Sequence, residues 1–136
     1  MSDPAAQSIT VSLPIADRPA SSAFYRTFLG QDPSGEPQDD GEPEPLQFVL
    51  NDGTRLMLIP TGGFAWVVGD DHPVAGPGQV EVLLSRAAAS EEEVRSWCLL
   101  ALSGGGRIVA EPNRQPWGYT AVVADPDGHL WQLATG

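Results

Sequence analysis

The feature that most constrains the fold of this chain is an element order that occurs twice, a strand and a helix followed by further strands. In the first copy, residues 9–15 alternate apolar with small polar side chains, which is typical of a strand with one face on a core. Asp17 then favours a helix start, and Gly30 favours its end. Two apolar runs, 46–50 and 55–59, flank an Asp-Gly pair that favours a tight hairpin turn.

The second copy follows a stretch rich in Gly and Pro, residues 61–78, which we predict to be a loop. It begins with an alternating run at 79–84 that indicates a strand. Ser90 and Glu93 have capping-box spacing and start a helix that ends before the glycines at 104–106. Further strands are predicted at residues 107–110, 119–123 and 130–133. The element order thus repeats with a period of about 70 residues.

The chain has 136 residues, which fits one domain. We predict a single α+β domain, 1–136, with module one at about 8–60, the loop at 61–78 and module two at about 79–134. Between the first helix and the hairpin, residues 31–45 are rich in Pro, Asp, Glu and Gly. They predict an acidic loop with a frayed edge strand.

Charge and composition exclude several classes of protein. The formal net charge of -11 disfavours nucleic-acid and membrane partners, and it favours a cationic ligand only weakly. No apolar run reaches the roughly 20 residues of a membrane span, and the start of the chain lacks a signal peptide, so we expect a cytoplasmic protein. Cys98 is the only cysteine and is predicted to be a buried, inert thiol.

Four motifs, taken in order, carry a resemblance to a known family. They are Leu-Pro-Ile-Ala-Asp at 13–17, Phe-Tyr-Arg-Thr-Phe-Leu-Gly at 24–30, Pro-Trp-Gly-Tyr at 116–119 and Asp-Pro-Asp-Gly-His-Leu-Trp at 125–131. With this element order, the chain resembles the vicinal-oxygen-chelate superfamily, which includes glyoxalase I, bleomycin-resistance proteins and extradiol dioxygenases. The resemblance implies two βαβββ modules that form a half-open, cup-shaped sheet with helices on the outer face.

Metal-using members of that superfamily hold a divalent ion with His and Glu side chains from four strand positions. Matching the motifs places Thr10, Met57, Gln79 and Gln132 at these positions. A hydroxyl, a thioether and two neutral amides supply none of the charge or imidazole donors that first-row metals prefer. The sequence therefore predicts no metal and no cofactor.

The predicted cup is lined by residues of mixed polarity, the usual composition of a small-molecule site. Strand alternation places these residues opposite the helix-packed face. They are Thr10, Ser12, Arg55, Met57, Gln79, Glu81, Leu130 and Gln132, with Trp117 and Trp66 near the rim.

Three functions remain open at this point. The favoured hypothesis is a protein that sequesters an aromatic or cationic small molecule without catalysis. The second is a metal-independent lyase or isomerase that uses Glu81 as general base. The third, suggested by fold analogy alone, is a metal-dependent glyoxalase or dioxygenase. The resemblance also implies a homodimer.

Overall fold

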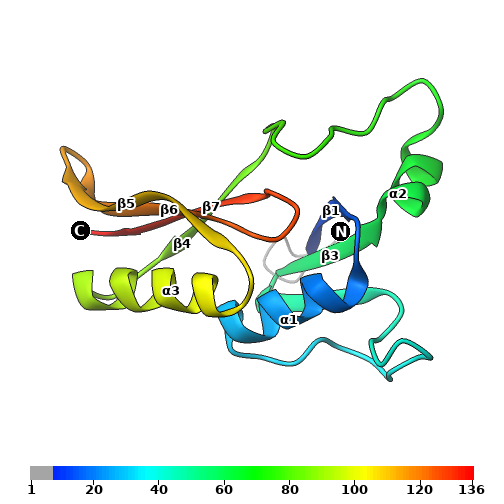
Figure 1. The fold of residues 1–136 in the computed structure, drawn as a ribbon, viewed down its shortest axis with the longest axis horizontal. Helices are drawn as coiled ribbons and strands as arrows, with labels where there is room; N and C mark the ends of the chain where they lie inside the picture. The colour runs from blue at the N-terminus through cyan, green and yellow to red at the C-terminus, as the bar shows by residue number, and fades with distance from the viewer. Residues whose placement is uncertain (1–7) are drawn as a thin grey trace, which may run out of the picture. The chain divides into compact units, whose positions relative to one another are not determined.

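The computed structural model describes residues 8–136, which divide into two compact units. Within the described chain, unit 1 contains residues up to Ser22 and Gln31–Val74, and unit 2 contains Ala23–Gly30 and Ala75–Gly136. Helix α1 (Arg18–Leu29) is shared, because its first residues group with unit 1 and the rest with unit 2. Figure 1 shows the elements in chain order by colour.

Unit 1 contains an open sheet of three strands in the order β1-β3-β2. Strand β1 (Ile9–Ile15) runs parallel to β3 (Thr54–Pro60), and β2 (Leu46–Asn51) runs antiparallel to β3. The predicted strand–turn–strand hairpin is confirmed, and the Asn51 side chain accepts a hydrogen bond from the Gly53 amide at 3.1 Å within its turn. The buried face of this sheet includes Leu13, Phe48, Leu56 and Leu58.

The acidic loop of residues 31–45 contains no strand, so module one has one strand fewer than predicted. Its only ladder contact in the described chain is an isolated bridge between Pro37 and Pro43. Arg18, the first residue of α1, holds the loop instead. Its Nε donates to Asp40 at 2.8 Å, and its NH2 group donates to the Pro43 carbonyl at 2.6 Å. With the Ser34 amide, which donates to the Gln47 carbonyl of β2 at 2.9 Å, these bonds hold the loop in the absence of a strand ladder.

Residues 61–78 were predicted to be a loop, and this is wrong for their first part. Helix α2 (Thr61–Val68) follows β3 directly and contacts both β1 and β3. The hydroxyl of Thr61 donates to the Ile15 carbonyl at 3.1 Å, and this bond fixes the first helical residue against β1. Gly62 and Gly63 lower helix propensity, so the helix depends on its contacts with β1 and β3.

Unit 2 contains a four-stranded sheet in the order β4-β7-β6-β5. Helix α3 (Glu91–Ser103) lies along it (Figure 1) and buries Val94, Cys98 and Ala101. The strands are β4 (Leu83–Ala87), β5 (Arg107–Gln115), β6 (Gly118–Ala124) and β7 (Leu130–Thr135). The Ser90 half of the predicted capping box is confirmed, since Ser90 accepts from the Glu93 amide at 3.1 Å; the Glu93 side chain accepts from the amide of Ala89, one residue before the N-cap, at 2.9 Å.

The predicted strand at 79–84 is displaced in the structure. Strand β4 begins only at Leu83, and residues 79–82 form an exposed loop before it. A strand needs a hydrogen-bonded neighbour, and the partner of Leu83 is Leu130, the first residue of β7. Earlier residues of the run have no strand beside them, although their alternation continues unbroken into β4.

A buried polar network explains two of the sequence motifs. The Tyr25 hydroxyl donates to the Asp125 carboxylate at 2.6 Å and accepts from the Trp131 indole at 3.2 Å. The other Asp125 oxygen accepts from the backbone amides of Asp127 and His129, both at 2.9 Å. Burial raises the pKa of Asp125, and burial beside that carboxylate raises the pKa of Tyr25. The network therefore joins the second half of α1 to the Asp-Pro-Asp-Gly turn and β7.

Candidate functional site

The face of each sheet opposite its buried side carries the candidate site residues. In unit 1, cross-strand partners point to the same side of the sheet. The register aligns Thr10 with Arg55 and Val49, and aligns Ser12 with Met57 and Gln47. We call these six residues the unit 1 open face. They alternate with the buried residues Leu56 and Leu58, which confirms the predicted parity for β1 and β3.

The unit 2 open face is defined in the same way. Ser85 pairs with Gln132, which pairs with Val122, and Leu83 pairs with Leu130; Ala124, the next partner of Leu130, is buried and does not belong to the face. The hydroxyl of Ser85 donates to the Gln132 side-chain oxygen at 3.5 Å. The intervening residues Trp131 and Leu133 are buried, so Leu130 and Gln132 occupy the predicted side of β7.

Gln79 and Glu81 do not lie on this sheet. Both are exposed in the loop before β4, and the Gln79 side chain accepts a hydrogen bond from the Gly76 amide at 2.8 Å. Their prediction as strand residues is wrong because the strand starts four residues later than expected. The residues that occupy the corresponding side of β4 are Leu83 and Ser85, which sequence reasoning missed. The alternation from Val80 to Leu84, extended by two residues, would have identified Ser85.

The two rim tryptophans are both strongly exposed. Trp117 lies in the turn between β5 and β6 with 66% of its surface exposed, and Trp66 lies on α2 with 84% exposed. Trp131 is instead buried, and Trp97 is half-buried with the Arg86 guanidinium 3.7 Å from the centre of its ring. Trp117 and Trp66 are therefore the tryptophans with the most exposed rings.

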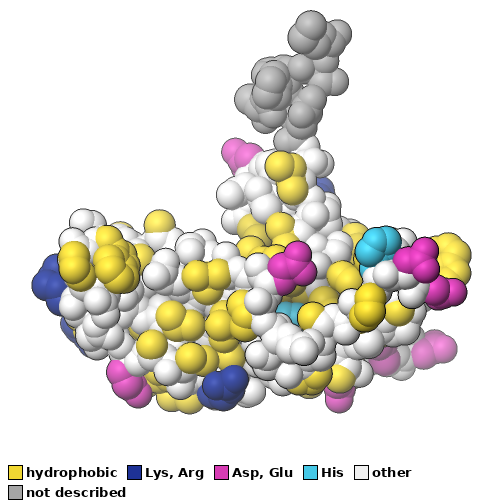
Figure 2. All heavy atoms as spheres, turned by 90° about the horizontal axis from the view of Figure 1, so that it is seen from above, with side chains coloured by type: hydrophobic (Ala, Val, Ile, Leu, Met, Phe, Trp, Pro, Cys, Tyr) yellow, Lys and Arg dark blue, Asp and Glu magenta, His cyan; other side chains and the backbone are white. Residues whose placement is uncertain are grey.

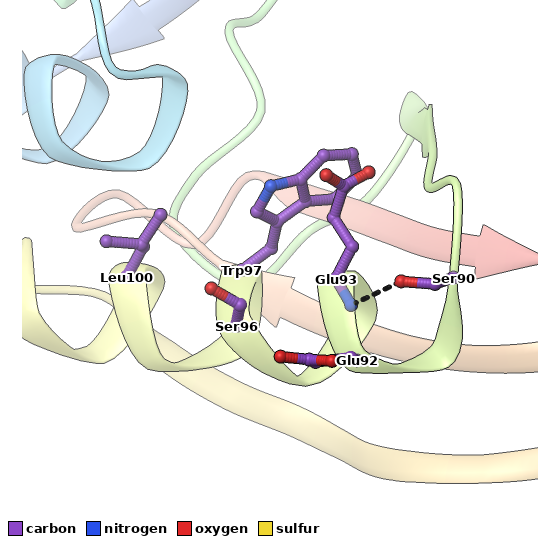
Figure 3. A pocket seen from close by; sticks show the side chains of 6 residues that line it. All are labelled: Ser90, Glu92, Glu93, Ser96, Trp97 and Leu100. Carbon is purple, nitrogen blue, oxygen red and sulfur yellow. Dashed lines mark hydrogen bonds between the residues drawn. The ribbon is translucent and has the colours of Figure 1, made fainter.

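A shallow hollow lies along α3 (Figure 3), with a volume of about 290 Å³. It is lined by Ser90, Glu92, Glu93, Ser96, Trp97 and Leu100. All six belong to one helix or its N-cap, and Ser90 and Glu93 are already used to cap that helix. The hollow is therefore a feature of the helix surface, formed by residues of α3 and its N-cap alone.

Comparisons with known proteins agree on one family. The sequence matches the Glyoxalase/Bleomycin resistance protein/Dioxygenase superfamily over residues 8–133. The chain belongs to this superfamily. A comparison with curated proteins finds no match. The resemblance predicted from the motifs is thus confirmed, and so is the mixed α+β class with two open sheets.

Solved structures extend this result. A glyoxalase-related enzyme from Fulvimarina pelagi is 28% identical, with a TM-score of 0.79, over 96% of this chain and 88% of that chain. The hypothetical protein SA1046 from S. aureus is 25% identical, with a TM-score of 0.79, over 96% of this chain and 94% of that chain. TnmS3, an antibiotic binding protein from Streptomyces sp. CB03234, shares the fold at 23% identity and a TM-score of 0.61, over 95% and 94% of the two chains.

Membership of this superfamily raises the question of a metal site, which the donor chemistry can answer. The register pairs Ser12 with Met57 in unit 1 and Ser85 with Gln132 in unit 2. Relative to the sequence mapping, Ser12 replaces Thr10 beside Met57, and Ser85 replaces Gln79 beside Gln132. Two hydroxyls, a thioether and an amide do not fit a divalent first-row metal. Within residues 8–136, no group of three or more His, Cys, Asp or Glu side chains is placed to hold an ion.

No helix among the described residues is both long and apolar enough to cross a membrane.

Proposed function

We propose that this protein binds and sequesters a planar aromatic small molecule at its open sheet faces, without a metal ion. The observation that carries the proposal is the donor set at the family's ligand positions. Neutral side chains occupy all of them, whether the sequence mapping or the strand register is used. A site without charged donors can still bind an organic ligand by apolar contact and hydrogen bonds.

The composition of the open faces supports this proposal. Met57 and Val49 offer apolar surface beside the neutral donors and acceptors of Ser12 and Gln47. These side chains are half-buried or exposed, so a ligand can reach them. The antibiotic-binding activity named for TnmS3 is compatible, because it shows that this fold can serve binding.

A catalytic role for Glu81 gains no support from its position. The side chain is exposed in the loop before β4, outside both sheets. The role of Glu81 as a catalytic residue therefore stays a prediction, and binding is the function that we favour.

The experiment is a ligand screen with and without chelator. Planar aromatic compounds of different ring size are tested by thermal shift and by isothermal titration calorimetry, before and after dialysis against EDTA, with metal content measured in parallel. We expect stabilisation by at least one planar compound and the same affinity after dialysis. Stoichiometric metal in the purified protein, together with loss of binding after dialysis, would contradict the proposal.

We further propose that the protein is a homodimer. Helix α2 supports this, because it has no charged residue, and Trp66, Val67 and Val68 on it are exposed. Hydrophobic side chains (yellow) are visible at several places on the surface in Figure 2. Contiguous exposed apolar residues often mark interfaces. Sedimentation at micromolar concentration measures the oligomeric state directly.

A further inference from the structure

Charge is segregated within this chain. The sequence has 18 acidic residues against seven basic ones, and every basic residue is an arginine. Among the strands of residues 8–136, however, the only acidic residue is Glu111 on β5. The acidity of the protein therefore belongs to loops and helices, and the sheets carry arginine.

Two of the seven arginines differ from the rest. Five have a hydrogen bond, ion pair, ring contact or other electrostatic interaction: Arg18, Arg26, Arg86, Arg95 and Arg114. Arg55 and Arg107 make none within residues 8–136, and both are exposed. Arg55 lies on the unit 1 open face, and Arg107 is the first residue of the edge strand β5.

Among residues 8–136, the neighbours of Arg55 leave its guanidinium free for a ligand. Thr10 lies beside it on β1 and Val49 on β2, and Met57 follows on the same side of β3. None of the six residues of the unit 1 open face is acidic. An arginine with no internal partner presents a planar fork of donors that matches a carboxylate, and the two parallel hydrogen bonds add orientation to the attraction.

We propose that the ligand of the unit 1 open face carries a carboxylate that binds the Arg55 guanidinium, while its planar apolar part lies on Met57 and Val49. This inference rests on the proposed function and specifies its ligand class. It replaces the cationic ligand suggested by net charge and by Glu81. At physiological salt, charges are screened over about 8 Å, so a ligand at Arg55 responds to the local guanidinium more than to distant acidic loops.

The test uses three ligands with one ring system and different charge: 2-naphthoate, 2-naphthamide and 2-naphthylmethylammonium. Their dissociation constants are measured by calorimetry with the full chain at physiological salt, where the distant acidic loops are screened. We expect the carboxylate to bind about tenfold or more tightly than the amide, as a charge-assisted bidentate contact would give. The ammonium compound should bind most weakly.

Variants then assign the effect to one residue. Arg55→Gln should reduce the affinity for 2-naphthoate to that for the amide, and Arg55→Lys should give an intermediate value because it keeps the charge without the fork. Arg95→Gln is the matched control. It removes one positive charge from an exposed site on α3, and the carboxylate affinity should not change. Amide chemical shifts of β1 and β3 report whether the ligand lies on this face.

The outcomes separate the two proposals. If none of the three compounds binds while another planar compound of the ligand screen does, the proposed function stands and this inference is wrong. If the amide or the ammonium compound binds as tightly as the carboxylate, binding stands and the role of Arg55 is refuted. The same holds if Arg55→Gln has no effect, or if only Arg107→Gln weakens binding. In that case Arg55 is a solvated surface arginine.

Discussion

The buried network around Tyr25 offers the sharpest test of how the sequence motifs stabilise the fold. The change Tyr25→Phe keeps the buried ring and removes only the hydroxyl. It takes one hydrogen bond from the Asp125 carboxylate and leaves the Trp131 indole without its acceptor. A hydrogen bond to a charged group contributes about 1.5–3 kcal/mol, and an unsatisfied buried donor costs about 1–3 kcal/mol. We expect a loss of about 3 kcal/mol in the free energy of unfolding.

Urea unfolding at pH 7, followed by far-ultraviolet circular dichroism, measures this loss. Tyr119→Phe is the matched control, because its hydroxyl only meets the exposed Arg95 side chain at 3.4 Å. That variant should lose less than about 0.5 kcal/mol. Equal losses in the two variants would refute the importance of the network, and so would a loss below about 1 kcal/mol for Tyr25→Phe.

The same network fixes the sign of a pH dependence. Burial raises the pKa of Asp125 above its ordinary value of 3.8, while the Tyr25 hydroxyl lowers it. Because the pKa of Asp125 is higher in the folded state, the protonated carboxyl stabilises the fold relative to the ionised one. This contribution to the free energy of unfolding is complete below pH 3.8 and is lost as pH rises through the folded-state pKa. Removing the hydroxyl destabilises the ionised form most. The loss in the free energy of unfolding caused by Tyr25→Phe should therefore be smaller at low pH than at pH 7. In an Asp125→Asn background, the loss should be the same at both pH values.

Three further variants address the loop, the acid and the dimer. Arg18→Gln should speed proteolytic cleavage within residues 31–45, because Arg18 supplies the hydrogen bonds that hold the loop; unchanged digestion would contradict this. Glu81→Gln should leave ligand affinity unchanged, since the side chain is exposed outside both sheets. A lower affinity in titration calorimetry would show that Glu81 takes part in ligand binding. Trp66→Ser should shift sedimentation towards monomer, and an unaltered dimer would exclude α2 as the interface.

The elements that could be predicted from sequence are those whose signals are local. Alternation located β1, and the Asp-Gly pair located the hairpin of β2 and β3. Ser90 and Glu93 located α3, because a cap depends only on residues within one helical turn. The side of the sheet predicted for Arg55 and Met57 was also correct, since period-two alternation determines which side of a strand a residue faces.

The errors all concern where a partner element begins or ends. Alternation from Val80 onwards is present, but the run becomes a strand only at Leu83, where β7 supplies hydrogen bonds. The local sequence of residues 79–82 does not show where β7 starts, because the two strands are far apart in the chain. The paired residues Ser85 and Gln132, for example, are 47 residues apart. Helix α2 was missed for a related reason. Its two glycines argue against a helix, and its contact with β1 and β3 cannot be read from the sequence.

The open face of unit 1 suggests how this member of the superfamily could bind an acid without a metal. A bound cation attracts anionic groups, but Ser12 and Met57 do not supply the donors that would hold one. Arg55 lies two residues before Met57 on β3, which places it on the same face at a spacing of about 7 Å. A guanidinium is a permanent positive charge that needs no ligands of its own. The face thus lacks metal donors and carries a fixed cation, and that cation favours binding by charge and shape over Lewis-acid chemistry.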